Sequence, residues 1–397
     1  MLGFLQPSLA LIRVNLSSLP RRWSTSLSTV LSVALVVVVL LGFLAMANGF
    51  RLSLTTAGSD TVAVVLSRGA LSEVTSRIGS QQLHLLQEAP RVARDGAGRA
   101  LVSEELVVPV DVLARDTGAT ETVSLRGLGG AGLSVRPLVT LSAGRPFTPG
   151  TGEIIVGARL ASDYRGLAVG DTVTFGRSRW TVVGHFTAAG SVYESEILAD
   201  SSVVQSQFNR LNQLQSVRVA LQDAAALADF TRYVEDAPQL GLTARSEAQY
   251  FAVESQRVSR IILWLGWPLA ALMAFGAAIG AMTAMYSSVS ERKVEIATVR
   301  ALGFSRSSAF VGTLCEALAL TLAGCGLGVS LAWLTLDGWA ASTRGMDSTR
   351  IGFELAMSWG QVVSAVILSL AIGLVGGGLP ALRAAGLPLH TALSGRG

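Results

Sequence analysis

The 397-residue chain is poor in charged residues. Asp, Glu, Lys and Arg make up only 15% of it, whereas 50% of the residues are hydrophobic and the mean hydropathy is +0.50. In soluble globular proteins about a quarter of the residues are charged, so this composition excludes an ordinary soluble domain. It also excludes a disordered chain, which needs low hydrophobicity and high charge. The sequence therefore predicts a membrane protein.

Residues that carry enzyme and metal chemistry are scarce. The chain has 2 cysteines, 3 histidines and a single lysine, Lys293. Two cysteines cannot build a disulfide scaffold or a Cys-rich metal site. The histidines form no H-E-x-x-H motif, and Lys293 does not follow the glycines of a G-x-x-x-x-G-K-[ST] phosphate loop. We expect no catalytic residues, no metal ligands and no cofactor held by this chain, and we do not expect it to be an enzyme.

The chain contains four long apolar stretches with few charged residues. Each is long enough for the roughly 20 apolar residues that a membrane-spanning helix needs. They predict an α-helical membrane protein with four transmembrane helices, at 25–48, 258–288, 308–335 and 358–381.

The positive charge is unevenly distributed among the short segments outside these helices. Residues 1–24, 289–307 and 382–397 hold nine Lys and Arg residues, whereas 336–357 holds two. Short loops rich in Lys and Arg stay in the cytoplasm. We therefore expect both termini and 289–307 in the cytoplasm and 336–357 to be a short extracytoplasmic loop. The basic pI of about 9.5 then reflects topology, and we expect no nucleic-acid partner.

The polar region 49–257 is expected outside the cytoplasm. Strand-like runs alternate there with turns and short helical patches, which predicts an α/β domain. Glycines and prolines at 144–150 indicate a boundary, so about 151–212 is expected to be an inserted β-rich subdomain. Residues 246–260 predict an amphipathic stalk helix that runs into the second span. The first segment, 1–24, predicts an amphipathic helix on the inner leaflet, and 382–397 a cytoplasmic tail.

Two kinds of residue stand out inside the predicted spans. Glu316 lies about eight residues from the cytoplasmic end of the third span. An intramembrane carboxylate is costly and indicates a function, but so near the surface it could also reach polar groups or water, so both interpretations stay open. Glycine pairs four residues apart permit close helix packing, within or between chains. These pairs are Gly276/Gly280, Gly324/Gly328 and Gly373/Gly377.

The cytoplasmic segment 289–307 is unusual for a passive connector, because apolar residues alternate with its charges. Such a mixed surface fits docking into the groove of a partner. Gly303 is predicted to end its helix and Ser305 to cap the next one.

This segment resembles a family motif. Glu291-Arg292, Glu295-Ile296 and Arg300-Ala301-Leu302-Gly303 resemble the E-R-x-x-E-I-x-x-x-R-A-L-G run of the MacB/FtsX-type permeases of ABC transporters, a family that includes LolC and LolE. Glu316-Ala317-Leu318 before Gly324, the closing run Leu379 to Ala385, and Gly144-Arg145-Pro146-Phe147 are similar to other segments of that family.

The resemblance implies a permease subunit of the bacterial inner membrane. Its outer domain would be a porter-like α/β unit, and a cytoplasmic ABC ATPase dimer on a separate chain would bind ATP and Mg. The segment 289–307 would be the coupling helix on that ATPase. The coupling residues would be Arg292, Glu295, Ile296, Val299, Arg300, Leu302, Gly303 and Phe304.

The resemblance also implies how the protein would work. ATP-driven movement of the outer domain would extrude or extract a substrate from the outer side of the membrane, by efflux or by lipoprotein or lipid release. The other partners would be a second permease copy or a homologous permease, and in efflux systems a periplasmic membrane-fusion adaptor. The alternative is an FtsX-like regulatory transmitter that controls a cell-wall hydrolase without transport.

Overall fold

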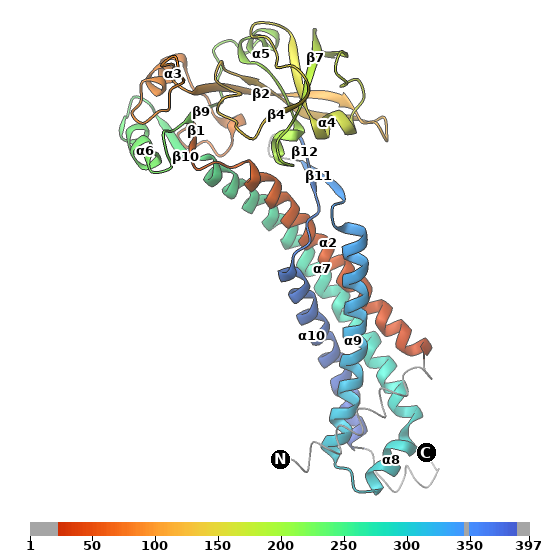
Figure 1. Cartoon of the computed structure of the whole chain (residues 1–397). Coiled ribbons are helices and arrows are strands. Elements are labelled where there is room, and N and C mark those ends of the chain that lie inside the picture. Colours follow the sequence, from red (N-terminus) through yellow and green to blue (C-terminus); the bar gives the residue numbers. More distant parts are fainter. Residues whose placement is uncertain (1–22, 345–348, 387–397) are drawn as a thin grey trace. The chain divides into compact units, whose positions relative to one another are not determined.

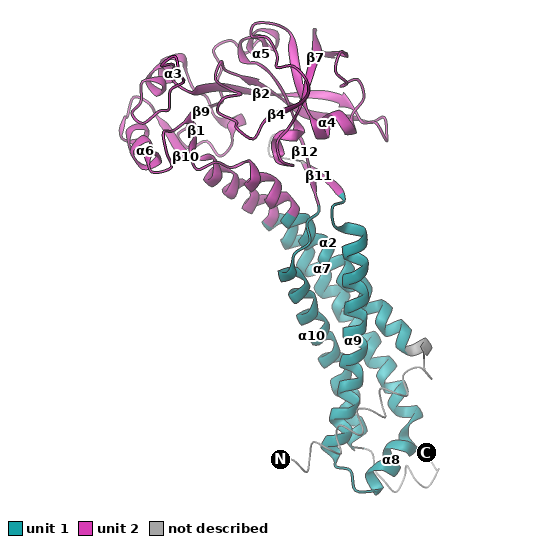
Figure 2. Cartoon of the chain, in the orientation of Figure 1, with its two compact units in different colours: residues 1–48, 260–339, 355–397 teal, residues 49–259, 340–354 magenta. Residues whose placement is uncertain are grey.

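The computed structural model describes residues 23–344 and 349–386, which fall into two compact units (Figures 1 and 2). Of the described residues, the helical unit comprises 23–48, 260–339 and 355–386. The sheet unit comprises residues 49–259 and 340–354. The amphipathic helix predicted within 1–24 and most of the predicted tail 382–397 lie outside the described residues.

Among the described residues, four helices are long and apolar enough to cross a membrane. They are α2 (Trp23–Ala57), α7 (Glu247–Glu291), α9 (Arg306–Leu336) and α10 (Trp359–Gly386). The first two extend well beyond the predicted spans, to Ala57 and back to Glu247. In α7, no glycine or proline lies between the polar turns before Arg260 and the apolar residues after it, so nothing in the sequence ends the helix there. In α2, Gly49 follows the predicted span, but a single glycine does not interrupt the helix. The predicted stalk and second span are thus one helix.

Glycines allow the helices of the helical unit to approach closely. A Cβ added at Gly324 or Gly328 would lie under 3.0 Å from atoms of α2, and one added at Gly373 or Gly377 under 3.0 Å from atoms of α9. Cβ atoms essentially never come so close to other atoms, so any larger residue would force these helices apart. Two of the three predicted glycine pairs therefore serve packing within this chain.

The third pair is different. Gly276 and Gly280 are exposed on α7, and an added Cβ there would meet nothing within 4 Å. Instead, Gly376 of α10 provides the close contact with α7, because its Cβ would lie 2.9 Å from the carbonyl oxygen of Ala278. The prediction that Gly276 and Gly280 pack a helix is not met within the described chain.

The sheet unit is built on a ten-stranded mixed sheet with the order β10-β1-β9-β2-β3-β8-β5-β7-β4, and β6 pairs with β7. The strands are β1 (Val62–Ser67), β2 (Val102–Leu113), β3 (Thr120–Leu128), β4 (Thr140–Gly144), β5 (Glu153–Gly157), β6 (Thr172–Phe175), β7 (Ser178–Thr187), β8 (Glu196–Asp200), β9 (Ser216–Ala220) and β10 (Leu242–Ser246). The short helices are η2 (Glu73–Thr75), α3 (Ser80–Gln87), α4 (Ala158–Asp163), η3 (Val192–Ser195), α5 (Ser201–Gln207) and α6 (Ala226–Asp236).

Strand β2 connects two hydrophobic cores. Its first residues, Val102–Glu105, pair with β9, and Val102 packs in the core beneath α3 and α6. From Glu105 onward it pairs with β3, and its apolar side chains enter the core that contains Trp180. Glu105 therefore stands where the strand passes from one core to the other.

The predicted boundary before residue 151 is absent from the structure. Strand β4 pairs with β7, and β3 pairs in parallel with β8, so 151–212 shares one sheet and one core with 102–144. Gly144, one of the residues that suggested a linker, ends β4 with φ +73°. A Cβ at Gly144 would clash with the β7 backbone at Val183 and Gly184, so glycine is needed for close strand approach and not for a domain boundary.

The loop predicted at 336–357 contains a β-hairpin. Strands β11 (Ala340–Arg344) and β12 (Arg350–Glu354) pair antiparallel, from Ala340 opposite Glu354 to Arg344 opposite Arg350. The sequence does not reveal them because each strand has only five residues and the two strands together hold only two large apolar side chains, Ile351 and Phe353. The hairpin belongs to the sheet unit.

Candidate functional site

The connector between α7 and α9 forms a short helix, α8 (Lys293–Ala301). Gly303 follows with φ +106°, a conformation that glycine adopts without strain. The Ser305 hydroxyl then accepts a hydrogen bond from the backbone N–H of Ser308 and caps α9. The predicted helix stop and the predicted cap are both confirmed.

A buried ion pair fixes this connector to α9. Arg292 Nη1 lies 3.3 Å from Glu316 Oε2, and Arg292 Nε donates to Glu295 at 2.9 Å. The Ser288 hydroxyl donates to Glu316 Oε1 at 3.4 Å. Arg292 is 6% exposed and Glu316 is 3% exposed. The cost of a carboxylate in the third span is thus offset by a guanidinium from the connector. This supports the interpretation that Glu316 reaches polar groups near the end of the span.

The inner face of α8 borders a cavity of about 60 Å³ beside this pair. Ile296, Val299 and Arg300 line the cavity together with Arg292 and Glu316. Arg292 is too deeply buried to lie on a docking surface, whereas Ile296, Val299 and Arg300 are each partly exposed.

The outer face of the connector carries the exposed apolar side chains. Leu302 is 76% exposed and Val294 is 58% exposed, and Phe304 is half-buried. The Glu295 side chain is 68% exposed although it contacts Arg292. Of the predicted residues, Glu295, Leu302 and Gly303 are exposed to a partner, and Ile296, Val299, Arg300 and Phe304 are partly exposed. Val294, which the predicted set omits, joins them, and its place among charged residues was the available signal.

A second group of buried charges lies in the sheet unit, around Glu105. The guanidiniums of Arg126 and Arg136 approach its carboxylate to 2.9 and 2.7 Å, and Arg218 also donates to it. Arg126 makes two further hydrogen bonds to Glu196, at 2.8 and 2.7 Å. We call this group the buried charge cluster; its members are Glu73, Glu105, Arg126, Arg136, Glu196, Arg218 and Glu247.

The arginines of the buried charge cluster lower the pKa of two of its acids, Glu73 and Glu105. Burial would raise the pKa of Glu73, but the charges of Arg126 and Arg218 outweigh burial and lower the pKa to about 2. The pKa of Glu105 is also lowered, because the three neighbouring guanidiniums outweigh its burial. Glu247, the first residue of α7, accepts from Arg218 Nε at 3.0 Å, so the cluster extends to that helix.

In residues 23–344 and 349–386, no three His, Cys, Asp or Glu side chains are grouped closely enough to hold a metal ion.

Four membrane-length helices, a large sheet unit after the first of them and a short helix in the connector define a multi-pass membrane protein with an extramembrane domain. Residues 26–237 match the family described as MacB-like periplasmic core domain, and residues 268–389 match the family described as FtsX-like permease C-terminal. The first match alone covers more than half of the chain. The chain belongs to the MacB/FtsX family of ABC transporter permeases.

Individual relatives agree with this assignment. The macrolide export ATP-binding/permease protein MacB of Rhodopseudomonas palustris (strain HaA2) is 30% identical over 245 residues, which cover 59% of this chain and 36% of that protein. The uncharacterized ABC transporter permease YknZ of Bacillus subtilis (strain 168) is 29% identical over 191 residues, covering 47% of this chain and 45% of that one. The chain thus spans less than half the length of these relatives.

Two solved structures are also similar. The extracellular domain of YknZ from Gram-positive bacteria has a TM-score of 0.36 at 16% identity, over 47% of this chain and 100% of that chain. The periplasmic region of MacB from Actinobacillus actinomycetemcomitans has a TM-score of 0.37 at 13% identity, over 49% of this chain and 92% of that chain.

Proposed function

We propose that this chain is a permease subunit in which a separate cytoplasmic ABC ATPase dimer, which binds ATP and Mg, drives movements of the sheet unit. These movements would extrude or extract a substrate from the outer side of the membrane. The observation that carries the proposal is the geometry around α8. Arg292, just before the helix, is held by the buried Glu316, and Leu302, just after it, is 76% exposed. An exposed leucine beside charges on a fixed short helix is suited to docking in a groove.

Truncating the exposed apolar residues of the connector tests the docking. Leu302→Ala/Phe304→Ala should weaken binding of the partner ATPase by about 2 kcal/mol or more, roughly thirtyfold, because interface anchors concentrate binding energy. Co-purification and titration of the ATPase measure this. Leu211→Ala is the matched control, since Leu211 is 68% exposed but lies in the sheet unit.

Gly303→Val should weaken ATPase binding by another route, because a β-branched residue is strained at φ +106°. If the double variant binds the ATPase and stimulates ATP turnover as the parent does, the docking assignment is wrong.

We infer that the chain lies in the bacterial inner membrane with both termini and α8 in the cytoplasm and the sheet unit outside. Besides the bias of positive charge, exposed tryptophans support this arrangement. Trp264, Trp339 and Trp359 are 77%, 61% and 77% exposed near the points where the chain enters or leaves the helical unit. Exposed tryptophans are typical of the membrane–water interface.

Labelling tests this topology. In a variant with both natural cysteines replaced by alanine, Arg177→Cys places a thiol in the exposed turn between β6 and β7. We expect a membrane-impermeant maleimide to label it in cells whose inner membrane is intact. Labelling that requires a permeabilised inner membrane would contradict the proposed orientation.

The remaining partners are a second copy of this chain or a homologous permease, and a membrane-fusion adaptor if the system performs efflux. The exposed Gly276 and Gly280 of α7 would suit close contact between two copies. ATP turnover of the reconstituted complex against macrolides and lipoproteins tests transport. Capture of a cell-wall hydrolase by the sheet unit, with no transported substrate, would favour the regulatory alternative.

A further inference from the structure

The chain passes between the two units at four points, after residues 48, 259, 339 and 354. At the first two it continues through the helices α2 and α7. At the other two it enters and leaves the hairpin β11–β12, which follows α9 and precedes α10 in the sequence. The hairpin is therefore a separate attachment of the last two membrane-length helices to the sheet unit.

Polar contacts seat the hairpin on the sheet unit. The Ser124 hydroxyl of β3 donates to Thr349 Oγ1 at 2.9 Å, and the backbone N–H of Gly352 donates to Ser195 Oγ at 3.0 Å. Arg350 forms an ion pair with Glu121. These contacts come from β3 and η3, so more than one element of the sheet unit holds the hairpin.

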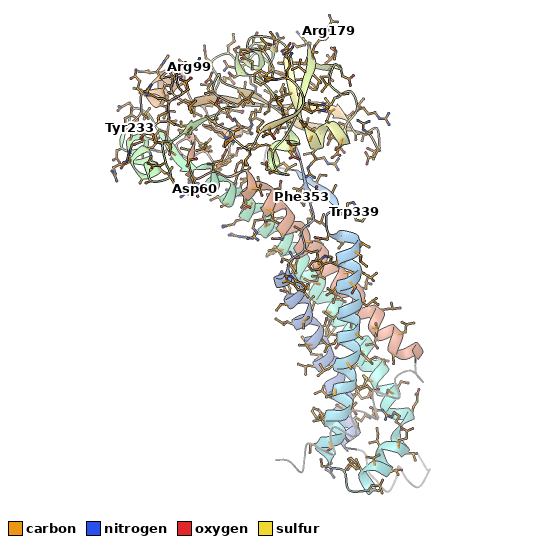
Figure 3. The ribbon with its side chains drawn as sticks, in the orientation of Figure 1. Asp60, Arg99, Arg179, Tyr233, Trp339 and Phe353 are labelled. Carbon is orange, nitrogen blue, oxygen red and sulfur yellow. The ribbon has the colours of Figure 1, made fainter. Side chains whose placement is uncertain are left out.

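A buried aromatic side chain also holds the hairpin on the sheet unit. We call these polar and aromatic contacts of β11–β12 the seat of the hairpin. Phe353 of β12, labelled in Figure 3, is 0% exposed. Its ring meets that of Phe50 edge-on, at 5.6 Å between the ring centroids. A Cβ added to Gly352 would clash with the Arg159 side chain, so the hairpin backbone lies close against α4. An isolated two-stranded hairpin is marginally stable in water, so these contacts stabilise β11 and β12.

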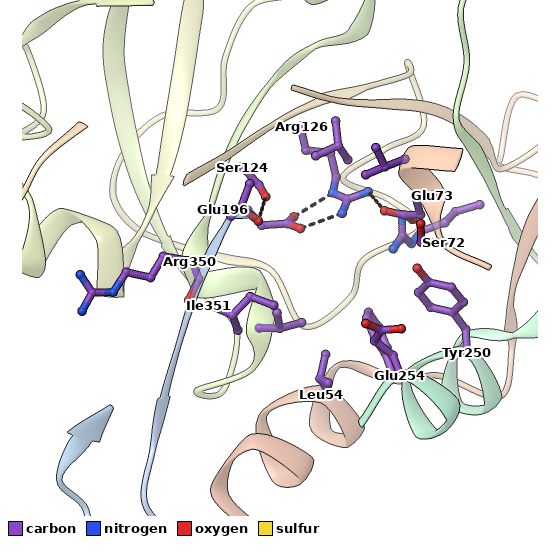
Figure 4. A pocket seen from close by; sticks show the side chains of 17 residues that line it. Leu54, Ser72, Glu73, Ser124, Arg126, Glu196, Tyr250, Glu254, Arg350 and Ile351 are labelled. Atoms are coloured by element: carbon purple, nitrogen blue, oxygen red, sulfur yellow. Dashed lines mark hydrogen bonds and ion pairs between the residues drawn. The ribbon is translucent and has the colours of Figure 1, made fainter. Parts of the chain in front are cut away.

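The contacts that hold the hairpin on the sheet unit lie next to the buried charge cluster. A cavity of about 90 Å³ is lined by Leu54 of α2, Tyr250 and Glu254 of α7, and Ile351 of β12 (Figure 4). Arg126, which binds Glu196 and Glu73, also lines it (Figure 4). The three segments that continue into the helical unit thus meet at one place inside the sheet unit.

We propose that the hairpin β11–β12 is a strap that stays seated on the sheet unit and transmits displacements of α9 and α10 to it. This inference rests on the proposed function. Arg292 and Glu316 fix the coupling connector to α9, and α9 runs as one helix from Arg306 to Leu336, four residues before the hairpin. Hydrogen bonds between Gly338 and Leu355 and between Leu355 and Trp339 close the base of the hairpin at 3.0 and 2.9 Å. A docked ATPase would then act on the sheet unit through α9 as well as through α7.

The test uses the full chain with its ATPase in lipid nanodiscs. Hydrogen exchange of the sheet unit is compared between nucleotide-free and ATP–vanadate samples. Phe353→Ala, which removes the buried aromatic anchor, should reduce the nucleotide-dependent difference by about fivefold or more, the lower end of usual allosteric coupling. ATPase binding should remain. Phe208→Ala, a half-buried phenylalanine outside the seat, should leave the difference unchanged.

A crosslink separates mechanical attachment from the side chain itself. Ser124→Cys/Thr349→Cys, added to Phe353→Ala with the natural cysteines replaced, should form a disulfide and restore the response, and reduction should abolish it again. If Phe353→Ala does not fold, Glu121→Gln/Thr349→Val, which removes two polar contacts of the seat, should reduce the response.

A full response in a loosened variant, or no recovery on crosslinking, would overturn the strap. A parent complex that binds no ATPase, or whose sheet unit does not respond to nucleotide, would overturn the proposed function and the strap with it.

Discussion

Replacing Glu105 by alanine is expected to destabilise the sheet unit by about 3–5 kcal/mol, the usual cost of removing one partner of a buried ion pair. Three guanidiniums point at this carboxylate, and the side chains of Arg126, Arg136 and Arg218 are only 7%, 0% and 1% exposed. Without Glu105 these buried guanidiniums would repel one another with one fewer carboxylate to offset their charge. Since domains are stable by only about 5–15 kcal/mol, this loss is large.

The effect is measured by unfolding the full chain in denaturant and monitoring the unfolded fraction by its proteolysis in the sheet unit. The measured quantity is the denaturant concentration at the midpoint. Glu105→Gln should fall between the parent and Glu105→Ala, because the amide oxygen still accepts hydrogen bonds but carries no charge. Asp229→Ala is the matched control, since its side chain is 48% exposed and those of its partners Arg91 and Arg232 are 46% and 67% exposed. Exposed ion pairs contribute little to the free energy of unfolding. The control variant should therefore unfold at a denaturant concentration close to that of the parent. Equal midpoints for Glu105→Ala and the parent would show that the cluster is not needed for stability.

Local signals in the sequence predict the helices and the connector. Apolar stretches long enough to span a membrane identify α2, α7, α9 and α10, and a glycine followed by a serine marks the turn into α9. These features depend on residues close together in the chain. The same is true of the longer strands, whose alternation of apolar and polar residues is visible over many positions, as in β7.

Features that depend on distant residues could not be predicted. Ser124 and Thr349 are 225 positions apart, and Arg126 and Glu73 are 53 apart, and nothing in the sequence distinguishes these side chains from the many other Arg, Glu, Ser and Thr residues. Strand β4 gives a weak signal in the sequence, because it has five residues with one large apolar side chain, Leu141, and is exposed along its whole length. Gly144 misled the prediction of a boundary because a strand contact and a linker both select glycine.

The pairing of Arg292 with Glu316 is an intermediate case. Both residues stand out in the sequence, one within a charged motif and the other within an apolar helix, and they lie just 24 positions apart across one turn. Opposite charges near the same end of neighbouring spans favour pairing. The sequence left the role of Glu316 open because it does not show which way either side chain turns.

Glu316→Ala should therefore destabilise the helical unit and disturb the connector. The substitution leaves the guanidinium of Arg292, which is 6% exposed, without its buried carboxylate, at a cost of about 3–5 kcal/mol. Glu295→Ala removes the other carboxylate that Arg292 contacts, but that side chain is 68% exposed, so the expected cost is below about 1 kcal/mol. Thermal unfolding of the nanodisc-embedded chain measures both, and trypsin cleavage after Lys293 measures how well α8 is held.

The double variant Arg292→Ala/Glu316→Ala decides whether the pair itself is responsible. If Glu316 acts by compensating Arg292, removing both residues should cost less than the sum of the two single losses, because no uncompensated charge remains buried. ATPase binding should follow the same order, since Leu302 can be presented correctly only while α8 is anchored. Additive losses, with ATPase binding unchanged in Glu316→Ala, would mean that the two residues act separately and that Glu316 does not position the connector.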